Sequence, residues 1–311
     1  MKKIITFICA FILLSGLPAP TAYALVPIDS ERPSSLTITY KYGEKLYEGL
    51  PVKIYRVASV APDGTYDLCG DFANYPVNIY GITSQSEWRQ VTSTLASYIR
   101  ADSLSPTAAS LTDTAGTAEF KNLVPGMYLT LSAIVESPAE IVIFEDFLTV
   151  IPYPSNSGEH NYDVQAYPKC EAYTPSIEEI EYKTVKLWRD EGAVEDRPKT
   201  VEIDIFKNGI LEATKTLSAA NNWSFTWTAP DDGSIWSVVE RNISEDYYVT
   251  IEKSGNSFVI TNTRLTDDPP APPTGDTSVA WHYALPMCIA GGILLIIATY
   301  RKRVSDDGQT N

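Results

Sequence analysis

The stretch Thr184-Val185-Lys186-Leu187-Trp188-Arg189-Asp190 alternates in side-chain character, as a β-strand does. Short segments of the same kind follow it along the chain, and turn residues separate them; Asn208-Gly209 predicts a hairpin. The further strands are expected around Val201–Ile205, Asn222–Trp227, Trp236–Glu240, Tyr247–Val249 and Phe258–Thr263. Many short strands with turns between them indicate an antiparallel β-sandwich over residues 182–265.

The order of short motifs in this sandwich resembles the B-type domain of collagen adhesins. The motifs are Val185-Lys186-Leu187-Trp188, Arg197-Pro198, Asn208-Gly209, Asn222-Trp223-Ser224-Phe225, a glutamate after a strand that begins with Trp236, and Ile260-Thr261-Asn262-Thr263. The resemblance implies an immunoglobulin-like fold in which Lys186 and Asn262 join spontaneously through an isopeptide bond. It assigns the catalytic role in this reaction to Glu240.

The chemistry of such a bond requires a buried lysine. Burial between two sheets disfavours the ammonium form of Lys186 and raises the pKa of a nearby carboxyl group. A neutral Glu240 can then polarise the carboxamide of Asn262 and relay protons while ammonia leaves. Strand alternation leaves the direction of Lys186 open, because Val185 and Leu187 are themselves candidates for the inward face; in that case Lys186 is an ordinary solvated lysine.

Residues 25–172 also indicate β structure, with one inserted helix. Ser35–Tyr42 and Val52–Val60 alternate with a period of two, and strands are expected around Ile141–Val150 and Tyr162–Tyr167. Ser84 and Glu87 form a capping-box pair. The apolar residues that follow at helical spacing are Trp88, Val91, Leu95, Tyr98 and Ile99.

Several motifs in this first part resemble the prealbumin-like β-sandwich domains of Gram-positive pilins. They are Thr112-Asp113-x-x-Gly116, Phe120-x-Asn122-Leu123 and Gly126-x-Tyr128-Leu129. Together with residues 182–265, the resemblance predicts an all-β chain of two tandem sandwiches, joined around residues 169–182.

Tyr167-Pro168-Lys169, preceded by Val164, resembles the pilin motif whose lysine accepts the threonine of the next subunit. His160 stands where that motif has Trp, and Ala166 where it has Val. Lys169 is therefore a candidate for an intermolecular crosslink, and the alternative is a solvated lysine. A second internal bond from Lys41 to Asn161 or Asp163 is a weaker hypothesis, because no matching glutamate is evident.

The C-terminal stretch Pro272-Pro273-Thr274-Gly275-Asp276 precedes an apolar run, residues 279–300, and Arg301-Lys302-Arg303 in a tail at 301–311. The run is long enough to span a bilayer, and the basic triplet favours a cytoplasmic tail. The order of parts resembles the LPxTG sorting signal, with Pro272 in place of Leu. It implies that a sortase cleaves between Thr274 and Gly275 and joins Thr274 to peptidoglycan or a neighbouring pilin subunit. The alternative is a permanent membrane anchor. Residues 266–278, which are rich in Asp and Pro, are expected to form a linker that includes the sorting motif.

The N-terminus agrees with export. Lys2-Lys3, an apolar run from Ile4 to Leu14 and Ala22-Tyr23-Ala24 predict a secretory signal peptide over residues 1–24. The net charge of −15 argues against nucleic acid as a partner. In this compartment Cys69 and Cys170 either form a disulfide or remain two unpaired thiols.

We expect neither an enzyme nor a cofactor. The two histidines exclude an obvious His-based triad or multi-His metal site, and internal bond formation is a single event without turnover. The sequence predicts a cell-wall-anchored structural protein, a pilin-type subunit or stalk. The alternative is a monomeric wall-anchored adhesin that binds a host or matrix ligand. The motif at Lys169 discriminates between them, because only a polymer needs an acceptor amine.

Overall fold

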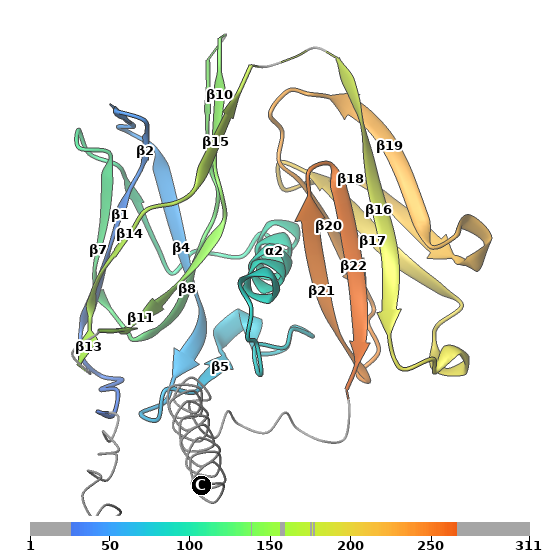
Figure 1. Ribbon diagram of the computed structural model, residues 1–311, viewed down its shortest axis with the longest axis horizontal. Coiled ribbons are helices and arrows are strands. Elements are labelled where there is room, and N and C mark those ends of the chain that lie inside the picture. Colours follow the sequence, from blue (N-terminus) through green and yellow to red (C-terminus); the bar gives the residue numbers. More distant parts are fainter. Residues whose placement is uncertain (1–25, 138, 156–158, 175, 177, 266–311) are drawn as a thin grey trace, which may run out of the picture. The chain divides into compact units, whose positions relative to one another are not determined.

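The computed structural model describes residues 26–137, 139–155, 159–174, 176 and 178–265, and these are mostly β (Figure 1). We call residues 26–174 the first β-region and residues 178–265 the second β-region. With the exception of Tyr80–Thr83, both belong to one compact unit. Within the described ranges no helix is both long and apolar enough to cross a membrane. The expected signal peptide, sorting motif and anchor (1–24 and 266–311) lie outside the described residues.

The first β-region is built on two main sheets. One has the strand order β14-β1-β7, and the other has the order β11-β8-β4-β5 with β6 paired to β4. The strands are β1 (Ser34–Thr39), β2 (Lys41–Tyr42), β3 (Lys45–Leu46), β4 (Pro51–Val60), β5 (Tyr66–Leu68), β6 (Ala108–Leu111), β7 (Thr117–Leu123), β8 (Gly126–Thr130), β9 (Ala133–Glu136), β10 (Ile141–Phe144), β11 (Phe147–Ile151), β12 (Tyr153–Pro154), β13 (His160–Asn161), β14 (Asp163–Ala166) and β15 (Cys170–Tyr173).

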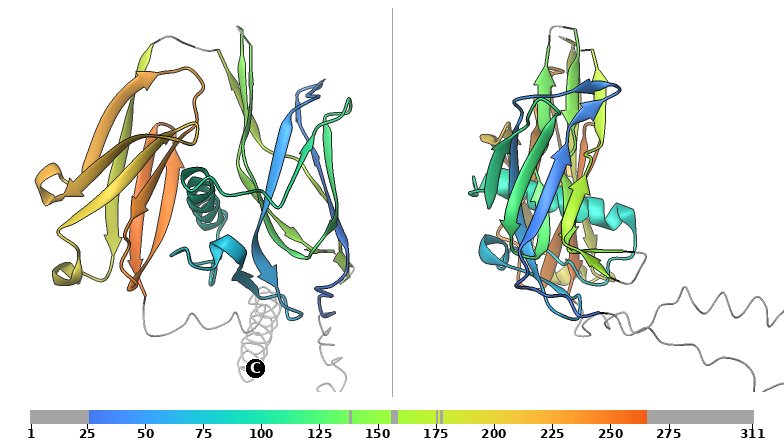
Figure 2. Two further views of the ribbon diagram at one scale, coloured as in Figure 1. Left: turned by 180° about the vertical axis from the view of Figure 1, so that it is seen from behind. Right: turned by 90° about the vertical axis from the view of Figure 1, so that its left-hand side faces the viewer.

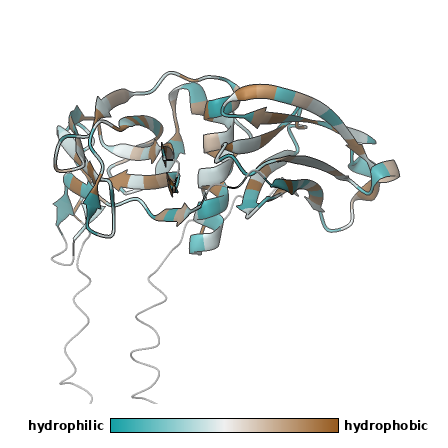
Figure 3. Ribbon diagram, turned by 90° about the horizontal axis from the view of Figure 1, so that it is seen from above, coloured by the Kyte–Doolittle hydropathy of each residue, from teal (hydrophilic) through white to brown (hydrophobic). Residues whose placement is uncertain are grey.

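Alternating apolar side chains make the core of this region. Leu36 and Ile38 of β1 are fully buried, whereas Ser35, Thr37 and Thr39, which alternate with them, are half-buried. Tyr40 packs edge-to-face on Phe144, with ring centres 5.0 Å apart. Figure 3 shows apolar and polar segments succeeding one another along the strands, and in β1 hydrophobic burial of one face holds the strand in place.

Ile141–Val150, which alternation presents as one strand, is divided between two sheets. β10 pairs with β15 and β9, whereas β11 pairs with β8. The break falls at Glu145–Asp146, where the Asp146 carboxylate accepts hydrogen bonds from Arg100 and from the backbone N–H of Ser132. The ion pair between the half-buried side chains of Arg100 and Asp146 lies at this break.

The segment 169–182, expected to connect two sandwiches, contains strand at both ends. β15 pairs along β10 through the main chain, and β16 begins at Glu179. Main-chain pairing of this kind needs no alternation of side chains, and so alternation did not predict β15.

The second β-region has two facing sheets, with strand orders β19-β16-β22-β21 and β18-β17-β20. The first and last strands, β16 and β22, lie side by side and run parallel. This pair departs from the fully antiparallel arrangement that was expected. The strands are β16 (Glu179–Arg189), β17 (Thr200–Lys207), β18 (Ile210–Ser218), β19 (Ser224–Pro230), β20 (Trp236–Arg241), β21 (Tyr247–Ser254) and β22 (Ser257–Arg264), with short 3-10 turns at η2 (Val194–Asp196) and η3 (Ala219–Asn221). A third 3-10 turn, η1 (Gly70–Phe72), belongs to the first β-region.

Helix α2 (Gln85–Ala101) contacts strands of both β-regions, β8 and β11 on one side and β20 and β21 on the other. Figures 1 and 2 show it between these strands. The Ser84 side chain caps its first turn by accepting a hydrogen bond from the backbone N–H of Glu87. The Glu87 carboxylate in turn accepts one from the backbone N–H of Ser84. Nearly every residue from Val91 to Ile99 is buried, so both faces of this helix are covered.

Candidate functional site

Three buried polar residues meet inside the second β-region. Lys186 lies on β16 and Asn262 on the neighbouring β22, where Lys186 pairs with Ile260 and Trp188 with Asn262. Glu240 lies on β20 of the facing sheet. Their exposed fractions are 2%, 3% and 2% for Lys186, Glu240 and Asn262. The two sheets therefore bring together the residues that the sequence motifs singled out.

The carboxylate of Glu240 lies between the other two side chains. Its Oε2 is 3.4 Å from Nζ of Lys186, and its Oε1 accepts a hydrogen bond of 2.7 Å from Nδ2 of Asn262. Nζ of Lys186 also donates to the backbone carbonyl of Leu187 over 2.9 Å. Glu240 thus contacts the amine and the carboxamide at once, one through each oxygen.

The direction of Lys186, which alternation left open, is inward. Lys186 follows Tyr182 and Thr184 on the buried face of β16, and Leu187 is 47% exposed. An apolar residue points to solvent here and a lysine points to the core. The partner on the facing sheet explains the exception, because a buried cation needs a polar partner.

Burial shifts the protonation of both ionisable groups toward their neutral forms. Desolvation lowers the pKa of Lys186 to about 8, although the Glu240 carboxylate opposes the shift. Desolvation also raises the pKa of Glu240, against the opposing effects of Lys186 and of the Asn262 hydrogen bond. A neutral amine beside a neutral carboxyl group is therefore accessible near physiological pH.

Aromatic rings enclose the lysine. Nζ of Lys186 lies 4.0 Å from the centre of the Trp188 ring, and Trp188 packs edge-to-face on Trp223 and Tyr247. In the described part of the chain, the Trp188 indole N–H and the Tyr247 hydroxyl are buried without a hydrogen-bond partner. Aromatic rings therefore make up this side of the lysine's surroundings. Residue spacing could have indicated Trp188, because residues two apart on a strand share a face.

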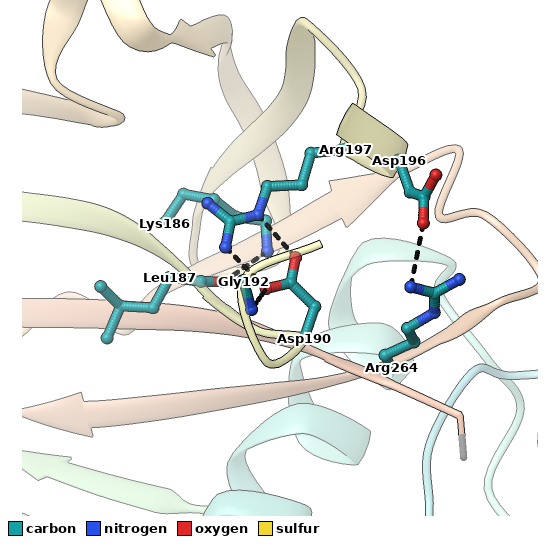
Figure 4. Close-up of polar contacts among 7 residues, drawn as sticks. All are labelled: Lys186, Leu187, Asp190, Gly192, Asp196, Arg197 and Arg264. Atoms are coloured by element: carbon teal, nitrogen blue, oxygen red, sulfur yellow. Dashed lines mark hydrogen bonds and ion pairs between the residues drawn. The ribbon is translucent and has the colours of Figure 1, made fainter. Parts of the chain in front are cut away.

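A second ion pair next to the lysine was not predicted. Arg197 donates from Nε and Nη2 to the two oxygens of the buried Asp190 carboxylate, at 2.5 and 2.6 Å (Figure 4). Asp190 also accepts a hydrogen bond from the backbone N–H of Gly192. The nearby charge of Arg197 contributes to the lowered pKa of Lys186, and that of Asp190 opposes it. The sequence identified Arg197 only as part of an Arg-Pro motif.

Lys169 lies at the surface of the first β-region. It is exposed, and it stands between the end of β14 and the start of β15. Its carbonyl accepts a hydrogen bond from the backbone N–H of Glu145, and the preceding Pro168 is buried. The backbone is held while the amine remains accessible to solvent.

Two hypotheses about other residues need correction. Cys69 and Cys170 are both free: the Cys69 thiol contacts the carbonyl of Arg56, and that of Cys170 contacts the carbonyl of Lys41. The disulfide alternative is therefore wrong, because the fold gives each thiol a different backbone partner. A second internal bond is also unsupported, since Lys41, Asn161 and Asp163 are all exposed, whereas the reaction requires a lysine that burial has desolvated. Thr274 and Gly275 lie outside the described residues.

Comparisons with known proteins add the following. The chain matches no curated protein. Solved structures that it resembles include a single B repeat unit (B1) of the collagen binding surface protein of Staphylococcus aureus, with 14% identity, a TM-score of 0.27, and coverage of 76% of this chain and 99% of that chain. The full-length major pilin SpaD of Corynebacterium diphtheriae gives 18% identity, a TM-score of 0.29, and coverage of 77% and 66%. The shaft pilin SpaA of Lactobacillus rhamnosus GG gives 14% identity, a TM-score of 0.28, and coverage of 76% of this chain and 100% of that chain.

A family match covers the strands that hold Lys186, Glu240 and Asn262. Residues 182–263 match the Cna protein B-type domain, so the second β-region is similar to that family.

Proposed function

We propose that the chain is a structural protein of the Gram-positive cell surface, stabilised by an isopeptide bond between Lys186 and Asn262. The observation that carries the proposal is the position of Glu240, whose two oxygens contact the amine and the carboxamide in a buried site. The match of residues 182–263 to the Cna protein B-type domain supports it.

The reaction uses only the groups of this chain. A proton passes from the Lys186 ammonium to the Glu240 carboxylate, and the neutral amine attacks the carboxamide carbon of Asn262. Glu240 then delivers a proton to the leaving nitrogen, with which Oε1 is in hydrogen-bond contact, and the resulting carboxylate takes the proton that the attacking nitrogen must lose. The C–N bond to that nitrogen breaks, ammonia leaves, and an amide joins the two side chains.

The placement of the bond suits a protein under tension. β16 and β22 are the first and last strands of the second β-region and lie side by side. A bond between them closes a loop of about 75 residues, which removes about 4–5 kcal/mol of chain entropy from the unfolded state. Force applied at the two ends of the region is then carried by a covalent bond rather than by the hydrogen bonds between strands.

The intact mass of the secreted form, residues 25–274, tests the bond. We expect a mass about 17 Da below that of the unmodified sequence, because one ammonia is lost. Lys186→Ala should restore the full mass. Lys183→Ala is the matched control, since Lys183 lies on the same strand with its side chain exposed, and it should retain the loss. A wild-type protein of full mass would refute the proposal.

We further propose a pilin-type subunit or stalk anchored to the wall, in which a sortase joins Thr274 to peptidoglycan or to Lys169 of a neighbouring subunit. The exposed amine of Lys169 on an anchored backbone supports this role. Wall extracts boiled in detergent should give a ladder of high-mass species on blotting. The ladder should disappear with Lys169→Ala and persist with Lys53→Ala, another exposed lysine of the first β-region. A single wall-released band would instead favour a monomeric adhesin.

A further inference from the structure

The first β-region contacts the second at β20, which carries Glu240, and at β21, which neighbours the strand of Asn262. The backbone N–H of Val249 donates to the carbonyl of Pro76 over 2.7 Å. Two residues on, the N–H of Ile251 donates to the hydroxyl of Thr94 on α2, also over 2.7 Å. Both groups lie on β21, the outer strand of its sheet. An outer strand normally leaves such N–H groups to solvent, whereas here the first β-region satisfies them.

The two bonded positions are those opposite the reacting strand. In the β21–β22 pair, Val249 lies opposite Asn262, and Ile251 lies opposite Ile260. Ile260 is in turn the partner of Lys186 in the β16–β22 pair. Pro76 and Thr94 therefore hold the strand against which Asn262 is positioned.

The strand that carries Glu240 is held from the same side. Every residue from Trp236 to Glu240 is buried, although β20 is the outer strand of its sheet, because α2 packs on it. Arg241, the residue after Glu240, donates to Asp102 at the end of α2 and to Asp204 of β17. Asp102 also accepts a hydrogen bond from Tyr75, and the Tyr75 ring stacks on Tyr98 of α2 at 4.3 Å.

Tyr98 lies close enough to the reacting carboxyl group to sense its charge. The residue is buried, and after desolvation the negative charge of Glu240 is the next cause that raises the pKa of its hydroxyl. The other charged groups that influence Lys186 are Asp190 and Arg197, both within the second β-region. The first β-region thus contributes the packing of α2 on β20, the hydrogen bonds to β21 and the ion pair of Asp102 with Arg241.

We propose that α2 and Pro76 of the first β-region are positioning elements for the isopeptide bond: they align β20 and β21 and keep water from Glu240, so that the second β-region reacts efficiently only when the first is docked on it. This inference rests on the proposed function. Under this proposal the bond forms only after both β-regions have folded and docked, because the covalent step follows docking.

Substitutions on α2 test this dependence. Thr94→Val removes the acceptor for Ile251 with little change of volume, and Thr94→Ser retains a hydroxyl. Thr92→Val is the matched control: Thr92, like Thr94, donates its hydroxyl to the carbonyl four residues earlier in α2, but the contact to Ile251 belongs to Thr94. Tyr98→Ala opens the wall beside Glu240, and Tyr98→Phe retains it.

The measurement is the rate of ammonia loss, followed by intact mass after the chain of the secreted form, synthesised and kept in urea so that it has not yet reacted, is diluted into buffers of increasing pH. We expect Thr94→Val to be about tenfold slower than wild type, Thr94→Ser to recover the rate, and Thr92→Val to match wild type. Tyr98→Ala should shift the pH midpoint of the rate upward from about 8, the pKa of the enclosed lysine. Water that enters beside Glu240 hydrates the Lys186 ammonium and so raises the pKa of that lysine. Tyr98→Phe should leave the midpoint unchanged.

The outcomes separate the two proposals. If wild type itself keeps its full mass, the isopeptide bond is refuted. If wild type loses ammonia and both Thr94→Val and Tyr98→Ala follow it in rate and midpoint, only the role of the first β-region is refuted. If circular dichroism shows that Tyr98→Ala is unfolded, the comparison of Thr94→Val with Thr94→Ser and Thr92→Val decides.

Discussion

Asn262 donates a hydrogen bond from Nδ2 to Oε1 of Glu240 over 2.7 Å, and the two residues come from facing sheets. The nitrogen that donates is the one that would leave as ammonia. A carboxyl group in this position is therefore placed to protonate a leaving group, which a purely structural hydrogen bond would not require.

Replacing Glu240 by Gln should abolish bond formation while preserving side-chain volume. We expect full mass, and a free energy of unfolding of the second β-region about 4–5 kcal/mol lower than in the crosslinked wild type, because the unfolded chain regains its entropy. Urea titration measures the difference. Glu181→Gln, an exposed position on β16, should change neither quantity, and an ammonia loss that survives in Glu240→Gln would contradict the assigned role.

Exchanging two neighbours tests the inward direction of the lysine. In the double variant Lys186→Leu with Leu187→Lys, the composition is kept but the lysine moves to the exposed face of β16. We expect full mass, because a solvated ammonium is not a nucleophile and points away from Asn262. Detecting the ammonia loss in this variant would mean that burial is not what enables the reaction.

The buried lysine should make the uncrosslinked fold more stable as the pH rises into the alkaline range. Asn262→Ala cannot form the bond, yet it retains Lys186. The pKa of this lysine is about 8 in the folded chain, and its ordinary value of 10.5 applies in the unfolded chain. The unfolded chain binds the extra proton between these values, so the free energy of unfolding should rise with pH across this window, by about 3 kcal/mol. Urea titrations at about pH 7 and about pH 11 would measure it. Adding Lys186→Met should flatten the rise, and a rise that persists would assign it to another group.

The two ion pairs of Figure 4 should differ in their contribution to stability. Arg197→Met leaves the buried carboxylate of Asp190 without its cation and should destabilise the fold by about 3 kcal/mol. Arg264→Met breaks an exposed pair with Asp196 and should cost at most about 0.5 kcal/mol. Denaturant midpoints of the two variants make the comparison, and equal losses would show that burial does not distinguish the pairs.

The acid dependence of the first pair has a definite sign. Bonding to Arg197 lowers the pKa of Asp190 below its usual value. Its contribution is therefore present above the unfolded pKa of about 4 and is lost as the pH falls through the lower folded value. In Arg197→Met this part of the acid sensitivity should disappear. Unfolding curves at about pH 7 and about pH 3 would reveal it.

Much of the β structure could be predicted from local patterns. Apolar alternation over Ser35–Tyr42 reflects one-sided burial, which acts residue by residue. The start of α2 is similarly local, because Ser84 and Glu87 satisfy backbone groups within one turn. By contrast, the break between β10 and β11 depends on Arg100, which is 46 residues from Asp146, and no local pattern contains it.

By itself, then, the sequence determined that the chain is mostly β and which residue types recur in the motifs of the second β-region. Only the tertiary structure decided that Lys186 faces inward, that Glu240 reaches it from the other sheet, and that Thr94 of a distant helix supports the strand beside Asn262. The physical reason is that alternation records burial along one strand. The desolvation of a lysine and its distance from a carboxylate depend on how separate sheets and a helix pack against each other.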